Sequence, residues 1–269
     1  MSKPKVLITS DDGFDSMGVR TLVHVLRDQF DLKIAGTLEQ QSGVGGHISL
    51  AHGGTWGVRR VDDIEALWVE GTPVDAVHCA QAYFKDIKFD LAISGINWGP
   101  NVGVSLMTSG TIAAAIRCLQ SQITNRAIAI SWDAPPKVWF SRVEGNQPLP
   151  KSFITYPGST TKKIVDLCLE NQFWSGELIS INLPSQKPSQ LKFTKPTNNV
   201  NQVYKLPPDL DHQKMTFRFP PEHAAKMETK LSTDIGALKA GYVTATIYTP
   251  LLWHKSNHDQ IKTKTINLI

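Results

Sequence analysis

The chain has 269 residues, of which 41% are hydrophobic and 19% charged, so it can bury the core of one large domain or two small ones. That composition excludes disorder, and the 19 glycines and 16 prolines show no three-residue period of the kind a collagen-like fibre needs. No apolar run reaches the roughly 20 residues of a membrane span, and the net charge of +4 comes from scattered lysines, which argues against a nucleic-acid duplex as partner.

The first residues pass straight into a short apolar run, without the longer apolar region or the cleavage site of a secretory signal. We therefore expect a cytoplasmic protein that does not bind membranes. Its cysteines, Cys79, Cys118 and Cys168, are widely spaced and show no metal-binding pattern. Each lies in an apolar helical pattern, and we interpret all three as core thiols.

The first 133 residues alternate strand-like and helix-like patterns, which is typical of a parallel sheet with crossover helices. Buried strands are predicted over 5–10, 31–36, 89–94 and 127–131. Helices are predicted to begin near Met17, at Thr72-Pro73 and after Ser109, because Thr and Ser are good helix caps and Pro suits a first helical position. Segments 48–51 and 55–61 flank His52-Gly53-Gly54 and predict a β-hairpin appended to the sheet, with another short strand over 67–70.

The second half is less regular. Residues 133–157 hold five prolines and predict a long surface excursion without regular structure, followed by a helix over 159–171 and a strand over 178–182. Beyond residue 183, prolines separate short β-like pieces such as 202–205 and 215–219, and the last strand is predicted over 242–248. We expect a catalytic α/β core over 1–183 and an arm over 184–269 that packs on the core and on a partner subunit.

Polar segments follow several predicted strands, where open parallel sheets bind their ligands. Ser10-Asp11-Asp12-Gly13 follows the first strand, 40–46 follows the second, and 95–101 follows the strand over 89–94. Adjacent buried carboxylates repel each other, so Asp11 and Asp12 call for a compensating cation. Carboxylate, hydroxyl and amide oxygens suit Mg²⁺, Mn²⁺ or Ca²⁺ and do not suit zinc. The simpler alternative is a turn whose Asp caps the next helix.

Ser109-Gly110-Thr111 offers backbone N–H groups and two hydroxyls at the positive end of a predicted helix, which is a suitable place for a phosphate. An ordinary serine cap is the alternative interpretation. The chain has neither a GxGxxG fingerprint nor a Walker A lysine motif, so a nucleotide would be held in another way.

In combination these segments resemble the SurE family, stationary-phase survival protein E, whose members are metal-dependent 5′(3′)-nucleotidases and acid phosphatases. The resemblance is carried by blocks that span nearly the whole chain, namely 6–18 (VLITSDDGFDSMG), Gln41-Ser42-Gly43, 94–103 (SGINWGPNVG), 109–115 and 241–246 (GYVTAT). It implies a Rossmann-like, doubly wound, mostly parallel sheet with a C-terminal arm exchanged or interlocked in a homodimer or homotetramer.

The resemblance also implies roles for individual residues. Asp11, Asp12, Ser42 and Asn97 would bind one divalent metal ion per subunit, Mg²⁺ or Mn²⁺, with Asp11, Asp12 and Asn97 as the catalytic residues. Ser109, Gly110 and Thr111 would contact the substrate phosphate. Three departures from the family pattern stand out. Ser10 replaces the usual Asn, Val104-Ser105 replaces the usual acidic pair, and Thr108 stands where Tyr is common.

The resulting hypothesis is hydrolysis of a small phosphomonoester, a nucleoside 5′- or 3′-monophosphate, with Asp12 chosen arbitrarily as proton acceptor. Candidates for the acid are His47, His52, His254 and His258, and Trp98 and Trp132 are candidates for stacking on a base. One rival is a SurE-like protein that binds a nucleotide or metabolite without turnover, or a phosphatase specialised for another ester. A haloacid dehalogenase-type phosphatase is disfavoured, because that class spaces its aspartates as Asp-x-Asp.

Overall fold

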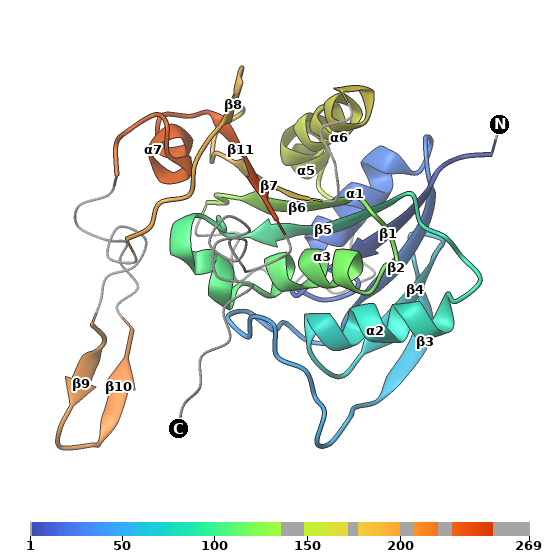
Figure 1. The fold of residues 1–269 in the computed structure, drawn as a ribbon, viewed down its shortest axis with the longest axis horizontal. Coiled ribbons are helices and arrows are strands. Elements are labelled where there is room, and N and C mark those ends of the chain that lie inside the picture. The colour runs from blue at the N-terminus through green and yellow to red at the C-terminus, as the bar shows by residue number, and fades with distance from the viewer. Residues whose placement is uncertain (1, 136–147, 172–176, 200–206, 220–227, 250–269) are drawn as a thin grey trace, which may run out of the picture.

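One nine-stranded sheet forms the centre of the molecule, which a computed structural model describes over residues 2–135, 148–171, 177–199, 207–219 and 228–249. The strands are β1 (Lys5–Thr9), β2 (Asp31–Thr37), β3 (Trp56–Val61), β4 (Ile64–Val69), β5 (Leu91–Trp98), β6 (Ala127–Trp132), β7 (Leu178–Leu183), β8 (Leu191–Phe193), β9 (Asp209–Asp211), β10 (Thr216–Arg218) and β11 (Val243–Tyr248). The order across the sheet is β3-β4-β2-β1-β5-β6-β7-β11-β8, and β9 and β10 form a separate ribbon (Figure 1).

Six consecutive strands of the sheet are parallel to one another, namely β4, β2, β1, β5, β6 and β7. At either end of this run the pairing is antiparallel, because β3 is antiparallel to β4 and β11 is antiparallel to β7. The chain moves outward from β1 through β2 to β4 and then returns to add β5, β6 and β7 on the other side. This reversal is the doubly wound arrangement, so the mostly parallel Rossmann-like fold class is confirmed. In doubly wound sheets such a reversal places the ligand-binding crevice outside the carboxyl ends of the two strands beside it, which are here β1 and β5.

Helices cover both faces of the sheet. In chain order they are α1 (Met17–Leu26), α2 (Pro73–Tyr83), the 3-10 helix η1 (Gly103–Thr108), α3 (Gly110–Gln120), α5 (Lys151–Phe153), the π-helical turn η2 (Ile154–Gly158), α6 (Ser159–Asn171) and α7 (Asp234–Lys239). Helices α1 and α6 pack on one face, α2 and α3 on the other (Figure 1). The centre of strand β1 is an unbroken apolar run because it is buried on both sides: Val6 and Ile8 pack toward the first face while Leu7 packs toward the second.

The predicted helix starts are confirmed. The Thr72 hydroxyl accepts a hydrogen bond from the Asp75 N–H while the Asp75 carboxylate accepts one from the Thr72 N–H, which makes a capping box at α2. Ser109 caps α3 by accepting from the Ile112 N–H, and α1 begins at Met17. The helix α6 has the predicted bounds.

The hairpin predicted around His52-Gly53-Gly54 is wrong. The structure pairs β3 with β4 instead, and residues 48–51 contain no strand. The two residues between these strands, Asp62 and Asp63, both have positive φ, 46° and 67°. This conformation is that of a type I′ hairpin turn, which aspartate tolerates. The bidentate ion pair of Arg20 with Asp62 fixes the turn on α1.

The prediction of an irregular excursion over 133–157 is wrong in its last part, since residues 151–158 form α5 and η2; residues 136–147 lie outside the described residues. Aromatic packing gives this segment its place. Phe153 lies edge-on against Trp98 and Trp132 with ring centroids 5.5 and 5.7 Å apart, and Tyr156 packs against Trp132 at 5.9 Å. The proline-rich segment is therefore attached to the sheet by its aromatic side chains.

Two strands of the C-terminal third complete the main sheet, while β9 and β10 form a ribbon that stands away from it (Figure 1). All six residues of the ribbon strands are exposed. The strand predicted over 215–219 is confirmed as β10 and that over 242–248 as β11, whereas 202–205 lies outside the described residues.

The thiols of Cys118 and Cys168 are buried as predicted, but Cys79 is only half-buried. Burial raises the pKa of Cys118 to about 12 and that of Cys168 to about 11, so neither thiol is reactive. Among the described residues, every helix is too short or too polar to traverse a bilayer.

Candidate active site

The carboxyl ends of β1 and β5 bring together most of the residues that the sequence singles out. Asp11 is 3% exposed, and its Oδ1 accepts a 2.6 Å hydrogen bond from the Thr111 hydroxyl at the start of α3. The close approach requires Gly110, because a Cβ there would lie 2.9 Å from both Cβ and Oδ2 of Asp11. The first turn of α3 is therefore packed directly onto the Asp11 side chain.

Asp12 is the more exposed of the two carboxylates, and three neighbours hold it. Its Oδ2 accepts from the Trp98 backbone N–H at 3.1 Å, and its Oδ1 accepts from the Gln40 side chain at 3.0 Å. The Ser10 hydroxyl accepts from the Asp12 backbone N–H at 3.1 Å. Ser10, which replaces the usual Asn of the family pattern, thus holds the Asp12 main chain.

Asn97 lies at the end of β5, just after an irregularity in the pairing of β5 with β6 between Ser94 and Asn97. Gly95 makes this possible, since its φ is 131° and a Cβ there would lie 2.2 Å from the Ile130 carbonyl oxygen. The Asn97 Nδ2 donates to the Gly99 carbonyl at 2.8 Å. With its donor end engaged on the backbone, the amide offers its carbonyl oxygen as a ligand.

Ser42 is exposed on the loop after β2 and is the least fixed of the four proposed metal ligands. The loop itself is tied to the site, because the Gln41 N–H donates to the Asp11 carbonyl at 2.7 Å and the Gly45 N–H donates to the Thr108 carbonyl at 2.9 Å. Gln40, which belongs to the polar run after the second strand, was not among the predicted site residues although it contacts Asp12 directly.

The predicted phosphate turn is assembled differently from the expectation. The Thr111 side chain and backbone N–H both donate to Asp11, so its hydroxyl is not turned to a ligand. The Ser109 hydroxyl accepts from the Ile112 N–H, which leaves its own hydrogen available as a donor. Ser109 and the Gly110 N–H are therefore the groups with which this turn can bind an anion.

The two carboxylates have strongly perturbed acidity. Burial, and next the charge of Asp12, raise the pKa of Asp11 to about 7, although the hydrogen bonds from Thr111 oppose this. Burial also raises the pKa of Asp12, against the hydrogen bonds from Trp98 and Gln40. Two neighbouring carboxylates that resist ionisation are the electrostatic setting in which a bound cation is most favourable.

The donor set fits a hard divalent cation. Two carboxylates, the Asn97 amide oxygen and a serine hydroxyl are oxygen ligands of the kind that Mg²⁺ and Mn²⁺ take. Within the described ranges, no three His, Cys, Asp or Glu side chains gather as zinc would require.

The residues that replace the acidic pair of the family pattern have structural partners. Val104 packs against a small cluster made by Val102, Ile235 and Leu238. Ser105 is buried, and its hydroxyl accepts from the Val102 N–H at 3.0 Å and donates to the Val102 carbonyl at 2.6 Å. Thr108 donates to the Ser105 carbonyl at 3.1 Å. All three residues help to shape η1.

The remaining candidates from the sequence are the four histidines proposed as the acid and the two tryptophans proposed to stack on a base. His47 and His52 are exposed on the loop after β2, and His254 and His258 lie outside the described residues. Trp132 is 6% exposed and its indole donates to the Pro184 carbonyl, so it is a core residue. Trp98 is half-buried, packs against Trp132 at 5.6 Å, and is joined to the site through its backbone.

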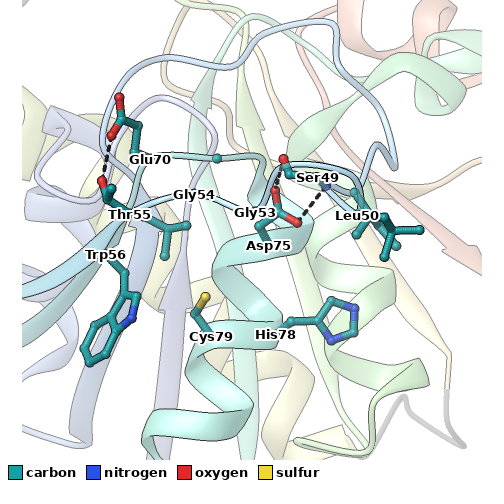
Figure 2. Close-up of a pocket in the computed structure, with 13 residues that line it drawn as sticks. Ser49, Leu50, Gly53, Gly54, Thr55, Trp56, Glu70, Asp75, His78 and Cys79 are labelled. Atoms are coloured by element: carbon teal, nitrogen blue, oxygen red, sulfur yellow. Dashed lines mark hydrogen bonds between the residues drawn. The ribbon is translucent and has the colours of Figure 1, made fainter.

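A second hollow, of about 490 Å³, lies between α2 and the loop before β3 (Figure 2). Its walls include Glu70 and Asp75, and Figure 2 shows His78 and Cys79 on the helix beneath the loop. Asp75 holds the loop by accepting hydrogen bonds from both the N–H and the hydroxyl of Ser49. Lysine and arginine are absent from its described lining, so this acidic hollow is unsuited to a phosphate.

The fold and this site define a doubly wound α/β protein with an acidic, oxygen-rich ligand site at the carboxyl edge of its parallel strands. The family model described as survival protein SurE matches residues 6–205, and the chain belongs to that family.

Relatives named 5′-nucleotidase SurE include one from Cytophaga hutchinsonii, 31% identical over 72% of this chain and 70% of the relative. One from Methanopyrus kandleri is 40% identical, but the match spans only 47% of this chain and 48% of the relative. One from Alkaliphilus metalliredigens is 28% identical over 98% and 99%. The crystal structure of the SurE protein from Aquifex aeolicus has the same fold, with a TM-score of 0.74 at 24% identity over 96% of this chain and 98% of that one.

Proposed function

We propose that the chain is a metal-dependent phosphomonoesterase that hydrolyses nucleoside 5′-monophosphates, and also 3′-monophosphates, to nucleoside and phosphate. The observation that carries the proposal is the pair of the buried Asp11 and the half-buried Asp12, with Asp11 set against the first turn of α3. The relatives' name, 5′-nucleotidase SurE, supports the 5′-monophosphate part of the proposal.

Asp11, Asp12, Ser42 and Asn97 would hold one divalent ion per subunit, Mg²⁺ or Mn²⁺. Such an ion supplies a Lewis acid for a phosphate oxygen and lowers the pKa of bound water. Thr111 lowers the pKa of Asp11 by donating to its Oδ1, in opposition to burial, and Gln40 and the Trp98 N–H orient Asp12. These partners fix both carboxylates before substrate arrives, which is where positioning gains its catalytic value.

The substrate phosphate would lie between this pair and the phosphate turn. The Ser109 hydroxyl and the Gly110 N–H donate to its equatorial oxygens, aided by the positive end of α3. Asp12 accepts the proton of the attacking water, because it is the carboxylate that reaches solvent, whereas Asp11 is enclosed. Burial, which raises the pKa of Asp12, favours that proton transfer.

The test is phosphate release from nucleoside 5′- and 3′-monophosphates and p-nitrophenyl phosphate, with Mg²⁺, with Mn²⁺ and with EDTA. We expect metal-dependent release that Asp12→Asn abolishes and Asp209→Asn, the same change at an exposed position, leaves intact. Folded wild-type protein that binds nucleotide with metal but releases no phosphate from any ester would overturn the proposal. It would support the non-catalytic binder instead.

The arm is proposed to join copies of the chain into a homodimer or homotetramer. A two-stranded ribbon is at best marginally stable alone in water, and β9–β10 exposes Leu210, Met215 and Phe217. A second copy covering these side chains accounts for both facts. Light scattering on the intact chain tests the association. A cytoplasmic location likewise stays a prediction, to be checked by cell fractionation.

A further inference from the structure

Asp234 forms a buried junction of three chain segments. This residue, the first of α7, is 1% exposed, and its carboxylate accepts hydrogen bonds from three backbone N–H groups. Oδ2 accepts from Gly103 at 2.6 Å, and Oδ1 accepts from Thr197 at 3.1 Å and from Ile235 at 2.8 Å. Gly103 is the first residue of η1, before α3, whereas Thr197 precedes the β9–β10 ribbon in the chain and Ile235 follows it. We call this point at Thr197 and Ile235 the root of the arm.

Apolar contacts reinforce the same junction. Val102, Ile235 and Leu238 form a separate buried cluster, and Val104 packs against it. The bond from Asp234 to Gly103 therefore lies between two apolar contacts made by the neighbours of Gly103. A charge-assisted hydrogen bond in such enclosed surroundings is short and strong, and the 2.6 Å distance agrees with this.

Gly103 is connected to the phosphate turn, Ser109-Gly110-Thr111, by a short segment whose turns are closed by hydrogen bonds. Gly103 opens η1, which ends at Thr108, directly before Ser109. Within η1, the Ser105 hydroxyl closes the first turn on Val102, and the Ser109 N–H donates to the Leu106 carbonyl at 3.3 Å. A shift of Gly103 would therefore move Ser109 and the start of α3.

We propose that Asp234 is a positioning residue that sets the phosphate turn through Gly103 and so couples the root of the arm to the active site. This inference rests on the proposed role of Ser109 and Gly110 in binding phosphate. Asp234 itself touches neither substrate nor metal ligands. Its effect is to keep the anion donors of the turn at a fixed distance from the Asp11–Asp12 pair.

The substitution Asp234→Asn separates the two sides of the junction. An amide of the same shape has only one acceptor oxygen, and its NH₂ group must face N–H groups on the other side. The oxygen retains two bonds if it faces Thr197 and Ile235, but only one if it faces Gly103. We expect the first orientation, which keeps the arm root and breaks the contact with Gly103.

Two measurements on the full-length protein read out this change. Hydrogen exchange should become at least tenfold faster for backbone amides of residues 103–109 and stay unchanged in β1 and β5. The inhibition constant of inorganic phosphate and the KM for substrate should each rise about tenfold, which is the usual scale for losing one charge-assisted hydrogen bond. The affinity for Mn²⁺ should stay within twofold of the wild-type value. Asp209→Asn, the same substitution on the exposed arm, should change none of these values.

Unchanged exchange and unchanged phosphate inhibition in folded Asp234→Asn would overturn the proposal. Equal losses of Mn²⁺ and phosphate binding would also overturn it, because they would show a general structural defect. If Asp234→Asn does not fold, Val104→Ala loosens the same loop more mildly and should show the same selective pattern. Should the wild type hydrolyse no ester, the proposed function fails, yet the exchange measurement still decides whether Asp234 holds the loop.

Discussion

The crevice at β1 and β5 and the β9–β10 ribbon are built on opposite principles. In the crevice, both carboxylates are held by groups far away in sequence, as Thr111 holds Asp11 across 100 residues and the Trp98 N–H holds Asp12. In the ribbon, every strand residue is exposed, and among the described residues each strand pairs only with the other strand of the hairpin. The comparison teaches that the crevice is preorganised by long-range contacts, whereas the ribbon strands are held by local pairing alone among the described residues.

The largest effect should come from Asp11→Asn, because it removes the enclosed charge of the crevice. We expect phosphate release to fall by about 1,000-fold or more. Burial and Asp12 raise the pKa of Asp11 to about 7, so the folded metal-free chain keeps a proton that the unfolded chain releases above about pH 4. Stability of the wild type without metal should therefore fall as pH rises from about 4 to 7.

In Asp11→Asn this part of the pH dependence should vanish, so the inactive variant should be the more stable one at neutral pH. Thermal unfolding in EDTA between pH 4 and pH 8 measures the difference. A wild-type midpoint that rises over this interval relative to the variant would show that Asp11 is not a strained carboxylate.

Thr111→Val sharpens the comparison by removing one partner of the crevice and leaving the carboxylate. Loss of the hydroxyl should raise the pKa of Asp11 further, since that hydrogen bond lowers it. Mn²⁺ binding should weaken about tenfold, and the acid limb of the activity profile should move to higher pH. Calorimetry and a pH profile measure these effects.

Thr161→Val is the matched control for that change. Thr161 is fully buried on α6, and its hydroxyl finds no hydrogen-bond partner among the described residues. The substitution should leave Mn²⁺ binding and activity unchanged and stabilise the fold slightly. Equal effects of the two valines would mean that the Thr111 hydroxyl has no special role.

Phe217→Asp tests the ribbon. The ring is 66% exposed, so its loss should change the stability of a single subunit by less than about 0.5 kcal/mol. A charge on a surface covered by a second copy should instead break the association. Light scattering should show a smaller particle with unchanged unfolding of the core. An unchanged mass would place the subunit contact elsewhere.

The smallest effect is expected far from both regions, at Asp63 in the turn between β3 and β4. Its φ of 67° suits glycine better than aspartate, so Asp63→Gly should stabilise the chain by about 0.5 kcal/mol. Activity should not change. Urea unfolding gives the stability change, and a loss of stability would show that the Asp63 side chain has a partner in the folded state.

The sequence predicts the sheet because its central strands are buried on both sides and are therefore rich in apolar residues. It misses the β3–β4 hairpin because Asp62-Asp63 is a weak turn signal and the glycines at 53 and 54 are a strong one. Phe153 and Tyr156 are held in place by packing against a tryptophan that is distant in sequence, and no local pattern reveals this contact. Local composition thus predicts the elements, and long-range packing decides the irregular segments.

At the site, the predicted residues from β1, β5 and α3 do lie together, because the carboxyl ends of parallel strands share one edge. The partners of each residue could not be predicted. Gln40 reaches Asp12 only through the course of its loop, and Thr111 turns to Asp11 because Gly110 admits the helix. The resemblance to a family supplied residue identities but no such contacts.

The place of β11 between β7 and β8 has a consequence for synthesis on the ribosome. β7 is complete at Leu183, yet the strand that covers its edge begins only at Val243. At about 5–20 residues per second, the ribosome needs several seconds to make the intervening stretch, during which the edge of β7 has no partner. The edge of β7 thus gains its partner in this sheet only after residues 243–248 have been translated.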